Sequence, residues 1–496
     1  MAEESLVQEY GEETLVKEIP PKAADLSKWY TAACWKAELF DYTPVRGSIA
    51  LRPYGYALWE NLQRQMDDRF KATGHVNAYF PLFIPESLLM REAAHVEGFA
   101  PEVAWVTHGG NEKLTERLAV RPTSEVIIGV MYARWVQSYR DLPILINCWN
   151  NVVRWEKATR PFLRTMEFLW QEGHTAHASH EESTEEVARM LEVYREVAED
   201  VCAMPVVTGE KSASERFAGA LHTFSIEALM PDGKALQAGT SHDLGQNFAR
   251  AYDIQFVDKD QQVKHAWTTS WGVSWRMLGG LIMMHGDDRG LRLPPALAPY
   301  QVVIVPIPKK GSDEPVTAAA RQVRDRLAKA GVRVRLDDRD EHKPGWKFSE
   351  WEMRGVPLRI EIGARDLEQN QVTAVRRDCD KGDAGAKTGL TLENLEAGVR
   401  ELLNAVQRGL HEQARADLDR HRFEAHTRDE FFDLLRRQAG LVRIPWCDDA
   451  ACEAEIKVQT SATTRNQVPL EEGAGPASCV ACGSPAKTRA YFARSY

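Results

Sequence analysis

Apolar and polar residues alternate with a period of two on both sides of an arginine-rich segment within residues 150–178. Because successive side chains of a β-strand point to opposite faces, this alternation predicts two strands joined by a connection of residues 157–165. Arg154 and Glu156 then share one face of the first strand. One face of the second strand carries the series Met166, Phe168, Trp170 and Glu172. The connection is longer than the two to five residues typical of a hairpin.

Stripes of apolar residues at helical spacing predict several helices. Asp25 and Pro53 mark two helix starts, since aspartate caps free amides and proline tolerates the first helical turn. The predicted helices cover residues 25–37, 53–74, 126–139 and 183–202. Strands are expected at residues 39–45, 48–52 and 76–85.

Side chains near the other helix starts have a capping interpretation. Thr123 or Ser124 can satisfy free amides before residue 126. Ser183 with Glu186 has the spacing of a capping box. A further helix is expected to begin near Ser274.

A proline-rich stretch, residues 291–300, separates this part of the chain from a region with a different pattern. Beyond it, apolar runs alternate with helical segments, which is typical of a sheet covered on both faces. Residues 391–439 are then predicted to be helical and highly charged. Since 496 residues are too many for one core, we expect three domains, covering residues 1–295, 296–405 and 406–496.

The composition is that of a globular protein. A formal net charge of −10 argues against indiscriminate nucleic-acid binding, so any RNA contact must use local basic patches. No apolar run approaches the length of a membrane span. The acidic N-terminus lacks the basic and apolar regions of a secretory signal, and we therefore expect a cytoplasmic protein without membrane attachment.

Four of the eight cysteines form two short pairs near the C-terminus, Cys447 with Cys452 and Cys479 with Cys482. Thiolates at this paired spacing are typical of a tetrahedral zinc site, and four of them leave no position for water. The pattern therefore predicts a structural Zn²⁺ site in a small α+β domain. Two other interpretations stay open, namely four reduced thiols or a labile redox pair.

The charged residues around the arginine-rich segment suit a nucleotide. Guanidinium forks match phosphate and carboxylate oxygens, Phe168 can stack on a base, and Glu156 can accept a hydrogen bond from an exocyclic amine. The alternative is an ordinary surface hairpin with solvated charges. The order of the pieces, Arg-x-Glu, basic loop and Arg-x-x-x-Phe, resembles motif 2 of the class II aminoacyl-tRNA synthetases.

That resemblance implies a role for each matching residue. Arg154 would bridge the amino-acid carboxylate and the α-phosphate of ATP. Glu156 would contact the adenine amino group, and Phe168 would stack on the adenine. Arg164 and Thr165 would hold the phosphate end.

Further blocks resemble the prolyl-tRNA synthetases, one family of this class. The Thr123-x-Glu125 loop looks like the one that binds the proline imino group. The run from Gln237 to His242 is similar to the family's Gln-x-Gly-Thr-Ser-His. It would place Gln237 and Thr240 at ATP and His242 at the proline ring. Trp170 would join this proline pocket.

The segment 268–290 resembles motif 3, in which an arginine lies against the γ-phosphate. Arg276 would have that role, and Ser274 would face the proline pocket. In the expected helix, Arg276 falls in the first turn, where the helix dipole prefers an acid, and such misplaced residues often serve a site. A helix, a strand and a terminal proline at residues 53–85 resemble motif 1, the dimer interface of these enzymes.

The resemblance implies a fold for each domain. The first would hold the class II antiparallel sheet of six to seven strands, and the second would be an α/β anticodon-binding domain. The third would be the zinc-bearing α+β domain. The chain resembles the archaeal and eukaryote-like type. The common bacterial form carries a large editing insertion, whereas residues 179–267 here are accounted for by expected elements of the catalytic domain.

The implied activity is ligation of L-proline to tRNA(Pro) through prolyl-adenylate, with ATP and Mg²⁺, by a homodimer. Arg154 and Arg276 would be catalytic through charge stabilisation. Without an editing insertion, the enzyme would form some alanyl-tRNA and depend on a separate deacylase. The alternatives are a paralogue that uses another small amino acid or a carrier protein, and a non-catalytic class II-like protein.

Overall fold

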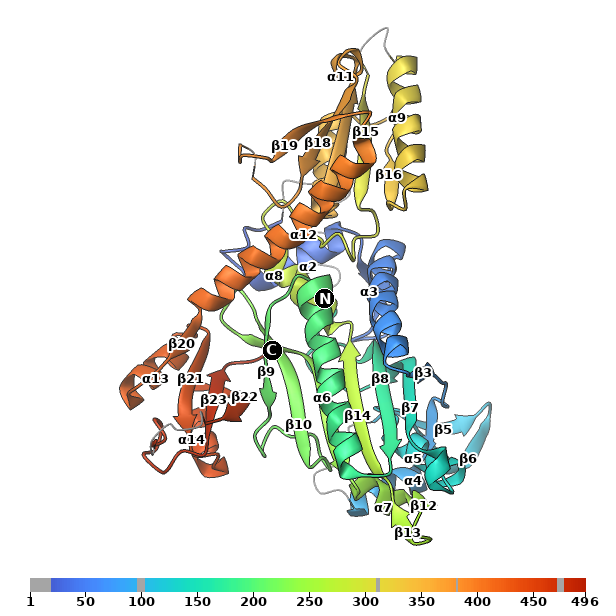
Figure 1. Ribbon diagram of the computed structural model, residues 1–496, viewed down its shortest axis with the longest axis vertical. Coiled ribbons are helices and arrows are strands. Elements are labelled where there is room, and N and C mark those ends of the chain that lie inside the picture. Colours follow the sequence, from blue (N-terminus) through green and yellow to red (C-terminus); the bar gives the residue numbers. More distant parts are fainter. Residues whose placement is uncertain (1–18, 96–102, 309–312, 381, 471–476) are drawn as a thin grey trace.

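The computed structural model describes residues 19–95, 103–308, 313–380, 382–470 and 477–496. Most of the acidic N-terminal segment considered above lies outside these residues. A five-stranded sheet occupies one end of the molecule, and a long eleven-stranded sheet crosses the other end (Figure 1). Among the described residues, no helix is both long and apolar enough to cross a bilayer.

The first elements agree with the apolar pattern. Helix α2 begins after Asp25, whose carboxylate accepts a hydrogen bond from the Lys28 N–H, and α3 begins with Pro53. A short hairpin lies between these helices. The elements are α2 (Leu26–Lys36), β1 (Phe40–Tyr42), β2 (Ile49–Leu51) and α3 (Pro53–Ala72).

The prediction of a single strand at residues 76–85 is wrong. The segment forms two short strands in different sheets, because Pro81 between them has no N–H with which to continue a ladder. Strand β3 (Val76–Asn77) pairs with β7, whereas β4 (Phe83–Pro85) pairs with β6. The small sheet around β4 and its neighbouring helix comprise α4 (Glu86–His95), β5 (Trp105–Gly109) and β6 (Glu112–Val120).

The two strands predicted from residues 150–178 pair as expected. Strands β7 (Ile144–Val153) and β8 (Glu167–His177) are antiparallel neighbours. However, β7 ends one residue before Arg154, so Arg154 and Glu156 lie in the connection and not on the strand.

Seven strands make the central and one outer part of the long sheet, in the order β9-β10-β11-β14-β8-β7-β3. All neighbours are antiparallel except β3 and β7. A Cβ at Gly173 of β8 would lie 2.1 Å from the Trp271 ring of β14, so glycine permits this close packing. The remaining strands of this part are β9 (Val206–Glu210), β10 (His222–Leu229), β11 (Ala235–Gly245) and β14 (Trp267–Ser274).

Helices cover one face of this sheet, and α6 runs across β10, β11 and β14 (Figure 1). Apolar side chains of α2, α3, α6 and α8 form one core against it, including Trp29, Leu62, Tyr194 and Leu281. The helices of this region are α5 (Glu125–Trp135), α6 (His180–Glu196), α7 (Asn247–Tyr252) and α8 (Arg276–His285), and a π-helical turn (Val197–Val201) extends α6. A small hairpin of β12 (Gln255–Val257) and β13 (Val263–His265) lies beside them.

Two capping predictions are wrong. Helix α6 begins after Ser179, whose hydroxyl accepts the Glu182 N–H, so Ser183 and Glu186 are inside the helix. Glu186 is instead buried against His75, 2.9 Å from its Nε2. Ser124 precedes α5 without a side-chain cap, because its hydroxyl donates to the Glu172 carboxylate.

The five-stranded sheet has the order β16-β15-β17-β18-β19 and follows the predicted alternation of strands and helices. Helices α9 and α12 pack against Val302 and Ile304, and α10 packs against Val303 and Val305, so both faces are covered. Its elements are β15 (Val302–Ile307), α9 (Asp313–Lys329), β16 (Val334–Leu336), α10 (Pro344–Met353), β17 (Leu358–Gly363), α11 (Ala364–Glu368), β18 (Gln371–Arg376) and β19 (Lys387–Thr391).

The prediction that residues 391–439 are continuously helical is also wrong, because β20 follows α12 within this range. The C-terminal strands extend the long sheet in the order β20-β21-β23-β22, and β22 pairs with β9. The elements are α12 (Leu395–Arg420), β20 (Arg422–Glu424), α13 (Arg428–Arg436), β21 (Leu441–Trp446), α14 (Ala450–Thr460), β22 (Thr463–Pro469) and β23 (Thr488–Ala493). The C-terminal region therefore shares its sheet with β9, β10 and β11.

Candidate active site

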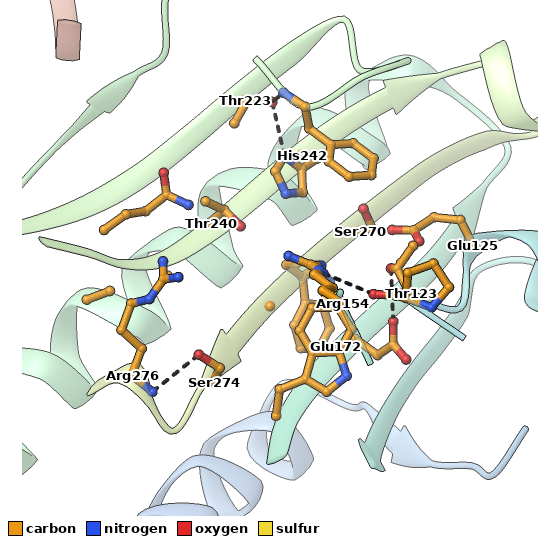
Figure 2. Close-up of a pocket in the computed structure, with 18 of the residues that line it drawn as sticks. Thr123, Glu125, Arg154, Glu172, Thr223, Thr240, His242, Ser270, Ser274 and Arg276 are labelled. Carbon is orange, nitrogen blue, oxygen red and sulfur yellow. Dashed lines mark hydrogen bonds between the residues drawn. The ribbon is translucent and has the colours of Figure 1, made fainter. Parts of the chain in front are cut away.

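The sheet face opposite α6 carries a cavity of about 340 Å³ (Figure 2). Alternation along the strands builds it: Ser270 and Ser274 of β14 line the cavity, whereas Val273 packs in the core. The lining residues are Pro122, Thr123, Glu125, Arg154, Phe168, Trp170, Glu172, His174, Glu215, Phe217, Thr223, Gln237, Ala238, Gly239, Thr240, His242, Ser270, Trp271, Gly272, Ser274 and Arg276.

Arg154 occupies the middle of the cavity in Figure 2. Its Nε donates to the Pro122 carbonyl at 3.2 Å, and its Cζ lies 5.5 Å from the Phe168 ring centroid and 5.4 Å from that of Trp170. The side chain keeps surface that is accessible to solvent. Enclosure by protein atoms nevertheless lowers its pKa, against the attraction of nearby carboxylates such as Glu125. The guanidinium is therefore an oriented cation inside a partly desolvated space.

Glu172 joins several groups at one end of the cavity. Its carboxylate accepts hydrogen bonds from the Ser124 N–H at 3.1 Å and from Asn150 Nδ2 at 2.8 Å. Thr123 Oγ1 donates to the Glu125 carboxylate and lies 3.4 Å from Glu172 Oε2. Glu172 thereby fixes the turn that carries Thr123 and Glu125.

Glu172 also forms a buried ion pair with His174, whose Nε2 lies 3.1 Å from Glu172 Oε2. Burial disfavours both charges, but the hydrogen bond between them lowers the pKa of Glu172 and raises the pKa of His174. Each partner therefore favours the charged form of the other.

His242 on β11 is neutral. Burial lowers its pKa to about 3, and the positive charges of His174 and Arg154 add to the effect. Thr223 Oγ1 accepts the Phe217 N–H at 3.1 Å and lies 3.0 Å from His242 Nδ1. This contact orients the imidazole ring next to Phe217.

Arg276 lies at the other end of the cavity from Glu125 (Figure 2). It is the first residue of α8, its Nε donates to the Leu163 carbonyl at 3.0 Å, and its N–H donates to Ser274 Oγ at 3.3 Å. Burial lowers its pKa, and the neighbouring cations Arg154 and Arg164 lower it further. Like charges held together in this way favour a bound polyanion.

A small pocket of about 30 Å³ shares Arg154, Phe168, Ser274 and Arg276 with the cavity and adds Glu156, Arg164 and Thr165. Glu156 Oε2 and Arg164 Nε are ion-paired at 2.7 Å. Thr165 Oγ1 is buried without a hydrogen-bond partner among the described residues. A ligand that bound both Glu156 and Arg164 as expected would have to separate this pair.

The structure thus brings together every residue that the sequence placed at proline or ATP. Sequence reasoning gave no role at the site to six further lining residues, namely Glu172, His174, Glu215, Phe217, Thr223 and Ser270. For Glu172 and His174 a signal existed, since both continue the alternation of Phe168 and Trp170 along β8. Thr223, Glu215 and Phe217 have no such signal, because their segment reaches the cavity only through the fold.

The four C-terminal cysteines converge as the spacing predicted. Their sulfurs all lie within 4.8 Å of one another, with 4.0 Å between Cys452 and Cys479 and 3.6 Å between Cys482 and Cys447. A tetrahedron with zinc–sulfur bonds of about 2.3 Å has edges of about 3.8 Å. The donor set therefore fits a tetrahedral metal site.

Comparison with known families identifies the parts of the chain. Residues 105–285 match the tRNA synthetase class II core domain (G, H, P, S and T), and residues 301–402 match an anticodon binding domain. Residues 428–496 match the C-terminal domain of prolyl-tRNA synthetase. The cavity with its two arginines therefore lies in a class II tRNA synthetase core.

Full-length relatives define the family more narrowly. The chain is 54% identical to a proline–tRNA ligase of Alkaliphilus oremlandii and 55% identical to one of Symbiobacterium thermophilum, each over 98% of this chain and 99% of the relative. It is 53% identical to a proline–tRNA ligase of Rubrobacter xylanophilus over 97% of this chain and 99% of the relative. The chain belongs to the proline–tRNA ligase family.

Proposed function

We propose that the chain ligates L-proline to tRNA(Pro) in two steps through prolyl-adenylate, consuming ATP and releasing pyrophosphate and AMP. One observation carries the proposal. Arg154 lies between an end of the cavity that is rich in carboxylates and an end that holds Arg276 (Figure 2). An imino acid fits the first end and a polyphosphate the second, so the reacting carboxylate and phosphorus would meet at Arg154.

In the first step a proline carboxylate oxygen attacks the α-phosphorus, a new P–O bond forms, and pyrophosphate leaves. No general base is needed, because the carboxylate is already ionised. Arg154 and Arg276 would be the catalytic residues, since their charges stabilise the growing negative charge on the phosphates. Magnesium would enter with ATP. In the second step a ribose hydroxyl at the tRNA 3′ end attacks the prolyl carbonyl, and AMP leaves.

Two residue sets would hold the substrates. The imino group would donate to Glu125 and to the backbone of Thr123, and the ring would lie among Trp170, His242 and Ser274. The proline set is Thr123, Glu125, Arg154, Trp170, His242 and Ser274. The ATP set is Arg154, Glu156, Arg164, Thr165, Phe168, Gln237, Thr240 and Arg276.

We further propose that Cys447, Cys452, Cys479 and Cys482 hold a structural Zn²⁺. The distances between their sulfurs support this assignment, because they bracket the edge of a zinc–thiolate tetrahedron. We keep the domain limits 1–295, 296–405 and 406–496, although β22 joins the third domain to the catalytic sheet.

The chain would act as a cytoplasmic homodimer of the archaeal and eukaryote-like type. Residues 179–267 form α6, β9 to β11, α7, β12, β13 and their connections, which supports the absence of an editing insertion. A separate deacylase would then remove mischarged alanine.

Amino-acid-dependent exchange of pyrophosphate into ATP tests the function. With purified chain and a panel of amino acids, we expect exchange with proline at the highest kcat/KM. Exchange driven by another small amino acid would favour the paralogue, and no exchange with any amino acid would favour a non-catalytic protein. Charging of tRNA(Pro) but not of a carrier protein would complete the assignment.

A further inference from the structure

The connection between β9 and β10, residues 211–221, forms one wall of the cavity. It contributes the side chains of Glu215 and Phe217. The Phe217 ring lies 4.7 Å from the His242 ring, and the Phe217 N–H donates to the Thr223 hydroxyl, which contacts His242 Nδ1. The position of this connection therefore determines how the rings of Phe217 and His242 are placed in the proposed proline site.

The outer side of the connection is held by β22 of the C-terminal region. Arg465 Nη2 lies 3.1 Å from Glu215 Oε2, and the Arg465 side chain is only 4% exposed. The hydroxyls of Thr464 and Ser212 are hydrogen-bonded at 3.0 Å. Gln467 Nε2 also approaches the Lys211 carbonyl at 3.4 Å, so three residues of β22 contact the connection, namely Thr464, Arg465 and Gln467.

Strand β22 is itself fixed on two sides. The Asn466 side-chain amide donates to the Val207 carbonyl at 2.9 Å and accepts from Ser225 Oγ at 2.7 Å. Gly209 permits this approach, because a Cβ there would lie 2.7 Å from the Gln467 carbonyl oxygen. From the other side, the buried Glu453 of α14 accepts the Thr464 N–H at 3.1 Å. Arg465 thus projects from a rigid support.

We propose that Arg465 is a positioning residue for the amino-acid pocket and acts through Glu215. This inference rests on the proposed function. The ion pair draws Glu215 toward β22 and keeps residues 211–221 against His242. The residues proposed to hold ATP lie outside this connection, so the interaction sets the apparent affinity for proline and leaves that for ATP nearly unchanged.

The expected change in KM follows from the loss of a charged hydrogen-bonded partner. In Arg465→Gln the KM for proline in pyrophosphate exchange rises about tenfold or more, and the KM for ATP stays within about twofold. Glu215→Gln has a similar effect. Arg465→Lys keeps the charge but loses the planar fork, so it recovers part of the proline affinity.

The double variant Arg465→Gln with Glu215→Gln separates positioning from direct contact. If Arg465 acts through Glu215, the double variant is no worse than the more damaged single variant. Effects that multiply would assign Glu215 its own contact with proline and would overturn the proposal. An unchanged KM for proline in both single variants, or equal changes in the KM values of proline and ATP, would also overturn it.

Arg489→Gln is the matched control. Arg489 lies on the adjacent strand β23 and pairs with Glu424, so we expect no change in either KM. If Arg465→Gln does not fold, Glu215→Gln carries the test, because Glu215 is partly exposed. Failure of the proposed function appears as absent proline-dependent exchange in the unaltered chain. Failure of this inference appears only as unchanged or parallel KM values in the variants.

Discussion

Arg154 is oriented by groups that leave its charge available to a ligand. A carbonyl oxygen and two ring faces fix the guanidinium, and the adjacent small pocket brings Arg164 and Arg276 next to it. Aromatic faces attract a cation without neutralising it. At the scale of single residues, Arg154 and Arg276 are therefore cations whose positions are set by uncharged partners.

Arg154→Ala tests this arrangement. We expect the barrier to proline-dependent pyrophosphate exchange to rise by roughly 3–4 kcal/mol, since a preorganised charge at the α-phosphate is lost. The measurement is kcat/KM for exchange. Arg250→Ala on the exposed surface of α7 is the control and should leave exchange unchanged. Unchanged exchange in Arg154→Ala would remove Arg154 from its proposed role.

The ion pair of Glu172 and His174 predicts a pH dependence of stability. Because the pKa of Glu172 is lowered in the folded chain, Glu172 contributes stability at pH values above its ordinary pKa of 4.5. This contribution is lost as the pH falls through the lowered pKa. The raised pKa of His174 stabilises the fold below 6.5, and this contribution is lost as the pH rises through the raised pKa. Both contributions are complete only between pH 4.5 and pH 6.5.

In His174→Gln the side-chain amide can still donate to Glu172, but the positive charge is absent. We expect the difference in unfolding temperature from the unaltered chain to be largest near about pH 6 and to shrink toward about pH 9. Thermal unfolding followed by circular dichroism across this range measures the difference. His421→Gln at the exposed end of α12 is the control. A pH-independent difference would rule out the charged pair.

Single residues were predictable where a local pattern carried them. Alternation along β8 placed Phe168 and Trp170 on the cavity face, and the same pattern extends to His174. Arg465 was not predictable, because its partner Glu215 is 250 positions away in the sequence. Such a pair depends on the sheet order and leaves no periodic signal.

At the scale of elements, α8 connects the cavity to the anticodon domain. It begins with Arg276, and Asp287 follows just after its end. Arg377 of the five-stranded domain donates to both carboxylate oxygens of Asp287, at 2.9 and 2.6 Å. Although burial opposes it, this contact with Arg377 holds the pKa of Asp287 well below its usual range.

Asp287→Asn leaves the buried Arg377 without its counter-charge. We expect a loss of about 3 kcal/mol of stability at the domain contact, and a larger fall in tRNA charging than in pyrophosphate exchange. Thermal unfolding and the two assays measure these effects. Asp288→Asn is the control, since Asp288 accepts an exposed backbone N–H from Lys22. Equal losses in both assays would show that the contact does not serve tRNA.

Local sequence chemistry predicted helix starts where no tertiary partner competed for the capping residue. Asp25 and Pro53 begin helices as expected. Ser124 does not cap α5, because the buried Glu172 takes its hydroxyl. Glu186 likewise does not form the expected capping box, because its carboxylate pairs with His75. In both cases a distant buried partner replaced the local hydrogen bond.

At the scale of the whole molecule, the antiparallel catalytic sheet and the covered five-stranded sheet followed from pattern and resemblance. The continuity of the long sheet did not, because β22 and β9 meet through the single pair Gln467 and Glu210. No hydrophobic period specifies that contact. The consequence is that the cysteine-bearing region supports the catalytic cavity as well as itself.

The cavity predicts limited discrimination against alanine. Alanine is smaller than proline and fits any pocket that accepts proline, so only lost apolar contact opposes it. That difference is about 1–3 kcal/mol, or roughly 10 to 200-fold in kcat/KM. We expect the purified chain to form alanyl-tRNA(Pro) and not to hydrolyse it. The measurement is release of labelled alanine from that product, and rapid hydrolysis by the chain alone would contradict the proposed need for a deacylase.

The proposed zinc site ties three elements of the C-terminal region together. Cys447 follows β21, Cys452 lies in α14, and Cys479 and Cys482 lie in the turn before β23. Loss of the metal would remove the link between them, and α14 also holds Thr464 of β22. We therefore expect a chelator to lower the unfolding temperature and to raise the KM for proline more than that for ATP.

Elemental analysis gives the direct measurement, with about one zinc expected per chain for a closed four-thiolate site. Cys452→Ser should lose the metal and the stability that depends on it. Cys379→Ser, which alters a thiol outside the cluster, should keep both. Full zinc content in Cys452→Ser would place the metal elsewhere. A metal-free chain with the same unfolding temperature would mean that the four thiols are structural without zinc, since packing in the core around Trp446 would then suffice.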